Sequence, residues 1–170
     1  MAEAGVPKPD TDIETGKTLA ENSAIKAKYA QAHAPGYWTM ADDTGIFIDA
    51  LDGFPGVHSA RWMGDDATTE EIMRGILKKM EGVQDRSATF KTSVVLVDPD
   101  GKEHVFSGER PGQLLEMPRC APQPSMPYSS IFLPDGAEKV WAEMKTEEEN
   151  VGSHRGKAFR QALAFLQEQP

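Results

Sequence analysis

The stretch Ala41-Asp42-Asp43-Thr44-Gly45 places two adjacent carboxylates between two apolar, β-prone segments, residues 37–40 and 46–48. Paired acids at the end of a strand are typical of a magnesium site, because this hard cation takes one or two carboxylates and completes its shell with water and substrate oxygens. In open α/β sheets, clefts for ligands form at strand ends. The same residues also favour a surface turn, so the stretch alone leaves both interpretations open.

The composition predicts one acidic domain. A chain of 170 residues is long enough to bury a core, and we expect a single domain over residues 1–170, with residues 1–12 flexible. The formal net charge of -9 offers no basic surface for nucleic acid. No apolar run resembles a signal peptide or a membrane span, and the single cysteine, Cys120, excludes an internal disulfide. We therefore expect a cytoplasmic protein with neither nucleic acid nor membrane as a partner.

Three helices are predicted from capping residues and apolar spacing. Thr18-Leu19-Ala20-Glu21 is a capping box that predicts a helix over residues 18–33. A second capping box, Thr68-Thr69-Glu70-Glu71, opens another helix, whose apolar stripe is expected in the core. The last segment, residues 153–167, carries apolar residues on one face and a serine able to cap its start.

The strands are predicted from β-prone runs between turn residues. A strand pair is expected on either side of Asp42 and Asp43. Two further strands, residues 89–97 and 103–107, are joined through the turn-forming residues 98–101. The proline-rich residues 111–134 predict a long loop.

Four blocks of sequence, taken in order, resemble the inosine triphosphate pyrophosphatase family. These are the block from Glu14-Thr15-Gly16 to Lys26-Ala27, the Asp42-Asp43-Thr44-Gly45 stretch, residues 53–62, and Ser153-His154-Arg155-Gly156-Lys157-Ala158. The resemblance runs from about Glu14 to the last helix. Any one of the four blocks would be a weak signal, whereas the four in order are a strong one.

The resemblance implies a fold and an activity. The expected fold is α/β, with an elongated central mixed sheet flanked by helices and two lobes around a cleft, assembled as a homodimer. The expected activity is magnesium-dependent hydrolysis of deaminated purine nucleoside triphosphates (ITP, dITP, XTP) to the monophosphate and pyrophosphate.

The family's catalytic positions correspond to four residues here. Asp43 is expected to bind the metal and activate water, with Asp42 supporting it, and Glu14 is the expected second metal ligand. Lys26 is expected near the phosphates. From the residues alone, Glu14 could also be a solvated acid, and Lys26 a solvated helix lysine.

The substrate-binding residues implied by the resemblance are Thr44, Tyr128, Ser153, His154 and Arg155. The last two fall in the first helical turn, where the helix dipole disfavours cations, and such a local misfit often marks a site. Thr44 could instead serve turn geometry.

The chain departs from the family pattern in three places. The family's first strand and its Gly-Asn-x-x-Lys loop would precede Glu14, and we expect the chain to lack both, leaving a sheet edge that is exposed or completed by other means. The base loop carries Pro127 and Ser129 in place of glycine and aspartate, and Glu149 replaces a lysine. A non-catalytic homologue that binds nucleotides or serves assembly, or a hydrolase of another phosphorylated compound, therefore stays open.

Overall fold

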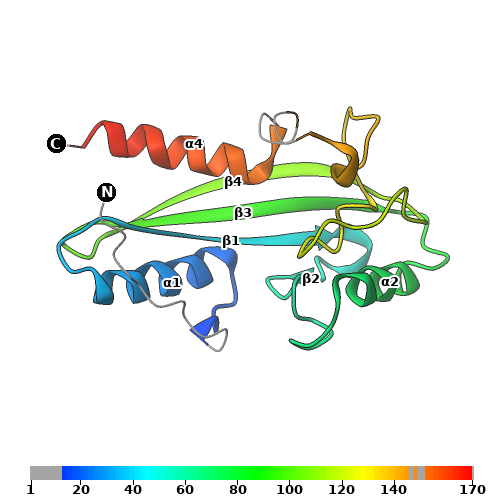
Figure 1. Ribbon diagram of the computed structural model, residues 1–170, viewed down its shortest axis with the longest axis horizontal. Helices are drawn as coiled ribbons and strands as arrows, with labels where there is room; N and C mark the ends of the chain where they lie inside the picture. Colours follow the sequence, from blue (N-terminus) through cyan, green and yellow to red (C-terminus); the bar gives the residue numbers. More distant parts are fainter. Residues whose placement is uncertain (1–12, 146–147, 149–151, 170) are drawn as a thin grey trace. The chain divides into compact units, whose positions relative to one another are not determined.

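The computed structural model describes residues 13–145, 148 and 152–169 (Figure 1). Its elements are α1 (Leu19–His33), β1 (Thr39–Ile48), β2 (Pro55–Gly56), α2 (Thr69–Lys79), β3 (Ser87–Val97), β4 (Glu103–Leu114), β5 (Phe132–Pro134) and α4 (His154–Gln167), with short 3-10 helices η2 (Asp49–Leu51) and η3 (Trp141–Glu143). The predicted α/β class is confirmed. The flexibility expected for residues 1–12 and the charge reversal at Glu149 lie outside the described residues.

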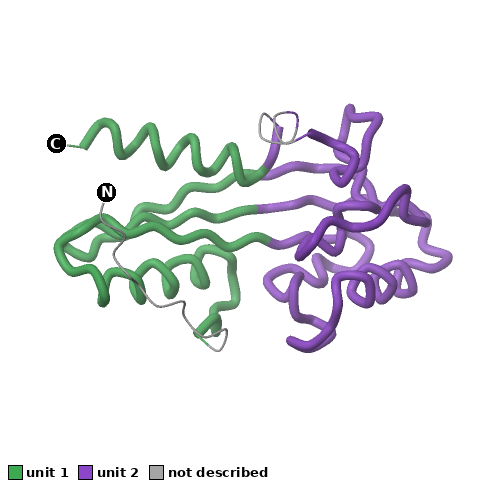
Figure 2. The backbone as a smooth tube through the Cα atoms, in the orientation of Figure 1, with its two compact units in different colours: residues 1–44, 92–108, 154–170 green, residues 45–91, 109–153 purple. Residues whose placement is uncertain are grey.

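The chain forms two compact units, shown in separate colours in Figure 2. Unit 1 holds residues 1–44, 92–108 and 154–170, and unit 2 holds residues 45–91 and 109–153. Strands β1, β3 and β4 contribute residues to both units. The single functional domain and the cleft expected from the sequence stay predictions.

The strands form one sheet in the order β2-β1-β3-β4-β5. β2 pairs with β1 only at Ile46 and Phe47, and β5 pairs with the end of β4. The expected mixed sheet was wrong, because the strands among the described residues are antiparallel. Short connections join β1 to β2 and β3 to β4, whereas a parallel pair requires a crossover of about a dozen residues or more.

In unit 1, helices α1 and α4 cover opposite faces of the strands (Figure 1). Alternate residues of β3 point to opposite faces. Val94 and Leu96 are buried with Ala158 and Ala162 of α4. Val95 and Val97 are buried with Ala27 of α1, whose small side chain allows close packing. The even and odd positions of one strand therefore build two separate apolar layers.

Both predicted capping boxes are present. Thr18 accepts the backbone N–H of Glu21, and the Glu21 carboxylate accepts the N–H of Thr18, so α1 begins at Leu19. Thr68 and Glu71 make the same reciprocal bonds at the start of α2. The apolar stripe of α2 lies in the core of unit 2, together with Ile46, Ile48 and Phe132. The predicted starts of these two helices are confirmed.

The interruption predicted at Asp42 and Asp43 does not occur, since β1 runs without a break from Thr39 to Ile48. The turn-forming residues are held in extended conformation by neighbouring strands. The Thr44 hydroxyl lies 2.7 Å from the Thr92 hydroxyl of β3. At Gly45, a Cβ would lie 2.3 Å from the carbonyl oxygen of Gly56, so the glycine allows close approach of backbone rather than a turn. Both the strand-end and the turn interpretations were therefore wrong.

The predicted loop over residues 111–134 was also wrong at its two ends. β4 continues to Leu114, and Gly112, Gln113 and Leu114 pair with Pro134, Leu133 and Phe132 of β5. Pro111 lacks an N–H, but its carbonyl accepts the N–H of Asp135. A proline at the edge of a paired segment is compatible with a strand, which the composition alone did not reveal.

Two buried serines of the sheet region provide a test of the packing. Ser93 is 4% exposed, and its hydroxyl has no hydrogen-bond partner among the described residues. Ser59 is 7% exposed, and its hydroxyl accepts the N–H of Ile46 at 2.8 Å and donates to the carbonyl of Gly56 at 2.6 Å.

We expect Ser93→Ala to leave the free energy of unfolding unchanged or to raise it by about 1 kcal/mol, because an unpaired buried hydroxyl is destabilising. The matched variant Ser59→Ala should lower the free energy of unfolding by about 1–2 kcal/mol, because the buried Ile46 N–H would lose its hydrogen-bond partner. Urea unfolding measures both. Equal destabilisation by the two variants would contradict the finding that the Ser93 hydroxyl makes no hydrogen bond with the described residues.

Candidate active site

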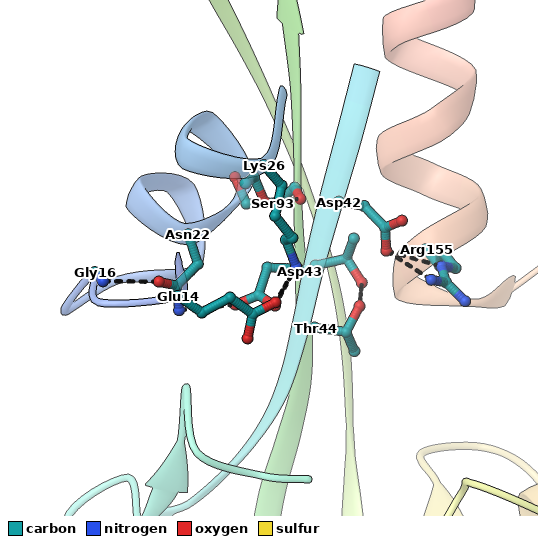
Figure 3. A network of polar contacts seen from close by, with 11 residues as sticks. Glu14, Gly16, Asn22, Lys26, Asp42, Asp43, Thr44, Ser93 and Arg155 are labelled. Atoms are coloured by element: carbon teal, nitrogen blue, oxygen red, sulfur yellow. Dashed lines mark hydrogen bonds and ion pairs between the residues drawn. The ribbon is translucent and has the colours of Figure 1, made fainter. Parts of the chain in front are cut away.

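The centre of the candidate site is Lys26, whose ammonium lies between two carboxylates (Figure 3). Its Nζ is 2.8 Å from Glu14 Oε1 and 2.9 Å from Asp43 Oδ1. The three side chains are between 12% and 18% exposed. Three segments that are separate in the sequence therefore meet at one largely buried ion cluster. The structure brings together Glu14, Lys26 and Asp43, three of the residues that the resemblance assigned to metal and phosphate chemistry.

Asn22 completes this cluster. Its side-chain amide donates to Asp43 Oδ2 at 3.3 Å, and its Oδ1 accepts the N–H of Gly16 at 2.8 Å. A Cβ at Gly16 would lie 2.7 Å from Asn22 Oδ1, so glycine is required for this approach. The sequence pattern did not predict a role for Asn22. Its position four residues before Lys26, one turn away on the same helix face, was the available signal.

The charges of the cluster shift the pKa of two groups. Burial lowers the pKa of Lys26, but the hydrogen bonds and charges of Glu14 and Asp43 outweigh it, so the pKa lies above its ordinary value. The pKa of Asp43 is raised mainly by burial, and the charge of Glu14 adds to the rise. The hydrogen bond and charge of Lys26 act in the opposite direction but do not outweigh these effects. One ammonium between two carboxylates leaves a negative charge in excess, which favours bound protons at both groups.

Asp42 lies on the opposite face of β1 from Asp43. Successive residues of a strand point to opposite faces. Asp43 faces Lys26 and Asn22 of α1, whereas Asp42 meets Arg155 of α4 (Figure 3). The side chains of these two neighbours therefore contact different helices, and the expected support of Asp43 by Asp42 stays a prediction.

Arg155 and Thr44 lie on the α4 side of β1. Arg155 donates through Nε and Nη2 to Asp42 Oδ2, at 3.0 and 2.7 Å. Its side chain is 60% exposed, compared with 19% for Asp42. The Thr44 hydroxyl is paired with Thr92, as described above. Arg155 thus presents its guanidinium to solvent while one edge is held by the protein.

His154 begins α4 and is buried, with 6% exposure. Burial lowers its pKa to about 3, with additional contributions from the charges of Arg155 and Lys157. The imidazole is therefore neutral at physiological pH. The misfit noted in the sequence is resolved in this way: the histidine at the helix start carries no charge, and the Arg155 charge is balanced by Asp42.

Tyr128 and Ser153 belong to unit 2. Tyr128 is 3% exposed, and its hydroxyl donates to the carbonyl of Ser59 at 2.7 Å and accepts from Trp62 Nε1 at 3.2 Å. Burial raises the pKa of this hydroxyl. The Tyr128 hydroxyl is thus bonded within the protein, and the expected contact of Tyr128 with the substrate stays a prediction. Ser153 lines a pocket of about 350 Å³ together with Arg110 and Trp141.

The base-loop replacement noted in the sequence has a local structural role. The Ser129 hydroxyl accepts the N–H of Gln123 at 2.9 Å and donates to the carbonyl of Met126 at 2.7 Å. Ser129 is 2% exposed. The Ser129 side chain therefore holds together the loop that runs from Gln123 to Ser129.

No group of three His, Cys, Asp or Glu side chains suited to a metal occurs in the described part of the chain. The carboxylate pair of Glu14 and Asp43 nevertheless converges on one cation, Lys26, with hard oxygen donors. In nucleotide sites, one or two carboxylates suffice for magnesium, because water and phosphate oxygens complete the shell. The donor set therefore fits a hard divalent cation bound together with a phosphorylated substrate.

No helix in the described residues has the length and apolar character needed to cross a membrane.

The buried, neutral His154 makes stability depend on pH. Between pH 6.5 and about 3 the unfolded chain binds a proton at this residue and the folded chain does not. The contribution of neutral His154 to the free energy of unfolding is therefore fully present above pH 6.5 and is lost as the pH falls toward 3. From pH 8 to pH 5 we expect a loss of about 2 kcal/mol from this group.

The variant His154→Gln should lack that part of the acid destabilisation. The free energy of unfolding of both proteins is measured in urea at pH 8 and pH 5. The loss between the two pH values should be smaller in the variant than in the native protein. An identical loss in the native protein and the variant would show that His154 is not the responsible group.

Comparisons with known proteins identify the family of this chain. Residues 2–165 match the Ham1 family. The dITP/XTP pyrophosphatase of Christiangramia forsetii is 40% identical over 153 residues, covering 90% of this chain and 78% of the relative. The dITP/XTP pyrophosphatase of Deinococcus deserti is 44% identical over 154 residues, covering 91% and 70%.

Solved structures give the same result. A HAM1 protein from Coxiella burnetii matches with a TM-score of 0.86 at 33% identity, covering 98% of this chain and 84% of that chain. The Ham1 protein of Staphylococcus aureus matches with a TM-score of 0.83 at 32% identity, covering 94% and 82%. The resemblance inferred from the four sequence blocks is confirmed, and this chain belongs to the Ham1 family.

Proposed function

We propose that this protein hydrolyses deaminated purine nucleoside triphosphates, namely ITP, dITP and XTP, to the monophosphate and pyrophosphate. Relatives that are 37–44% identical over most of the chain carry the name dITP/XTP pyrophosphatase. The observation that carries the proposal is the cluster in which Lys26 lies within 2.9 Å of both Glu14 and Asp43.

The cluster supplies the groups that this hydrolysis needs. A water oxygen must bond to the α-phosphorus while the bond from that phosphorus to the bridging oxygen breaks and pyrophosphate leaves. Asp43 is the proposed base, because a carboxylate beside the proposed metal can accept the proton of the attacking water. Lys26 is the proposed partner of the phosphate oxygens, since its flexible side chain can turn from a carboxylate to a phosphate.

We propose magnesium as the cofactor, held by Glu14 and Asp43. The support is the convergence of these two carboxylates on one cation. Asn22, bonded to the second Asp43 oxygen, would orient that carboxylate. When bound, magnesium would neutralise charge on the triphosphate as a Lewis acid.

Recognition of the substrate is proposed for four residues. The resemblance implies that His154 and Arg155 contact the 6-keto purine, that Ser153 lies beside them and that Thr44 lies beside the triphosphate. A neutral imidazole offers one donor and one acceptor, and the arginine offers only donors. This combination suits a base edge that carries a carbonyl oxygen.

The assay for this proposal is pyrophosphate release from a panel of purified triphosphates with magnesium. We expect turnover of ITP, dITP and XTP well above that of ATP and GTP. Asp43→Asn should lower kcat by about a hundredfold or more, because the variant loses the proposed base. Removing magnesium with a chelator should stop turnover.

Two further variants sharpen this assay. Glu14→Gln should raise the magnesium concentration needed for half-maximal rate, since one ligand becomes neutral. Glu103→Gln, which removes an exposed partner of Lys28 in the same unit, is the matched control and should behave as the native protein. Thermal stabilisation by ITP without turnover would support the non-catalytic binder instead. Turnover confined to phosphorylated compounds other than purines would support the third alternative.

We also propose a homodimer in the cytoplasm. The resemblance supports the dimer, and the exposed free thiol of Cys120 supports a reducing compartment. Sedimentation velocity at micromolar protein concentration should give the mass of two chains. A monomeric mass throughout the concentration series would contradict the proposed dimer.

A further inference from the structure

The contact between Asp42 and Arg155 has a specific form. Two N–H groups on one edge of the guanidinium, at Nε and Nη2, donate to a single oxygen, Asp42 Oδ2. An arginine fixed through two donors on one edge cannot rotate freely about its last bonds. The other N–H groups, two at Nη1 and one at Nη2, are not used by Asp42. Asp42 therefore sets the plane of the group and the direction of its remaining donors.

This contact is not needed to place α4. The start of the helix lies directly on β4, because a Cβ at Gly108 would lie 2.0 Å from the carbonyl oxygen of His154. Further along, Ala158 and Ala162 are fully buried against Val94 and Leu96. An ion pair in which the arginine is 60% exposed adds only about 0–1 kcal/mol to stability. The main effect of the pair is on the orientation of Arg155.

Asp42 is also separated from the proposed chemistry. It lies on the α4 face of β1, whereas Glu14, Lys26 and Asp43 meet on the α1 face (Figure 3). A role in activating water would require it on the other face. Its contacts instead connect it to the arginine proposed for base recognition.

We propose that Asp42 is a positioning residue that orients Arg155 toward the 6-keto oxygen of the purine. The inference rests on the proposed function, in which Arg155 contacts the base. A keto oxygen accepts a hydrogen bond, whereas the 6-amino group of adenine donates, so a guanidinium with fixed donors favours the former. Asp42 thereby contributes to selectivity between purines without touching the substrate.

Binding measured by calorimetry separates this role from catalysis. The ligands are the α,β-methylene analogue of ITP, which resists hydrolysis between these phosphates, and inorganic triphosphate, which lacks a base, each with magnesium. We expect Asp42→Asn to weaken the ITP analogue about tenfold, because an orienting charged hydrogen bond is lost. Binding of inorganic triphosphate should change less than about twofold, within the scatter of such measurements.

A double-mutant cycle identifies the partner. On an Arg155→Lys background, which keeps the charge but loses the planar fork, Asp42→Asn should have less than about a twofold effect on the ITP analogue. Asp42→Glu, which keeps a carboxylate, should recover part of the affinity. Glu103→Gln again serves as the control, and thermal unfolding of each variant verifies the fold.

Three results would overturn the inference: unchanged affinity of Asp42→Asn for the ITP analogue, equal weakening of both ligands, or additive effects of the two substitutions. Failure of the proposed function gives a different pattern, in which the native protein binds the ITP analogue but releases no pyrophosphate from ITP. Absence of binding of either ligand to the native protein would overturn both.

Discussion

The ammonium of Lys26 between the carboxylates of Glu14 and Asp43 is the interaction on which the rest of the site depends. Two carboxylates that are largely removed from water repel each other, and each loses hydration. A single cation at 2.8 and 2.9 Å offsets much of both effects. The cluster also joins the segment before α1, the helix itself and β1. Its charged contacts thereby help to fix the positions of these three segments around Asp43.

The continuity of β1 determines how the site is divided. Because side chains alternate along a strand, two neighbouring aspartates serve different partners. Asp43 meets the lysine and asparagine of α1, while Asp42 meets the arginine of α4. The apolar layers beneath follow the same rule in β3, where Val94 and Val95 pack against different helices. Polar chemistry and core packing are therefore arranged by one periodicity, and a turn at Asp42 would have disrupted both.

The sequence predicted the features that depend on local contacts and missed those that depend on pairing between distant segments. The starts of α1 and α2 follow from a threonine and a glutamate three residues apart, so they could be read directly. The continuity of β1 depends on contacts with other strands, such as the bond between Thr44 and Thr92, 48 residues further along the chain. The extension of β4 depends on its pairing with β5, and the prolines of residues 111–134 had favoured a loop there. Likewise, Glu14, Lys26 and Asp43 were found through the family resemblance, whereas Asn22 and the Asp42–Arg155 pair required the structure.

The charges around Lys26 also bear on the proposed binding of a nucleotide together with a cation. Glu14, Lys26 and Asp43 together carry one negative charge in excess, and Asp42 balances Arg155 on the other face. A triphosphate is itself strongly anionic, so its approach to these groups would bring like charges together at short range. The chain as a whole, at a formal net charge of -9, gives no compensating attraction. A divalent ion held by Glu14 and Asp43 would reverse the local sign and release Lys26 toward the phosphates. The electrostatics of the chain's own residues thus favour binding of metal and triphosphate as a pair over binding of the triphosphate alone.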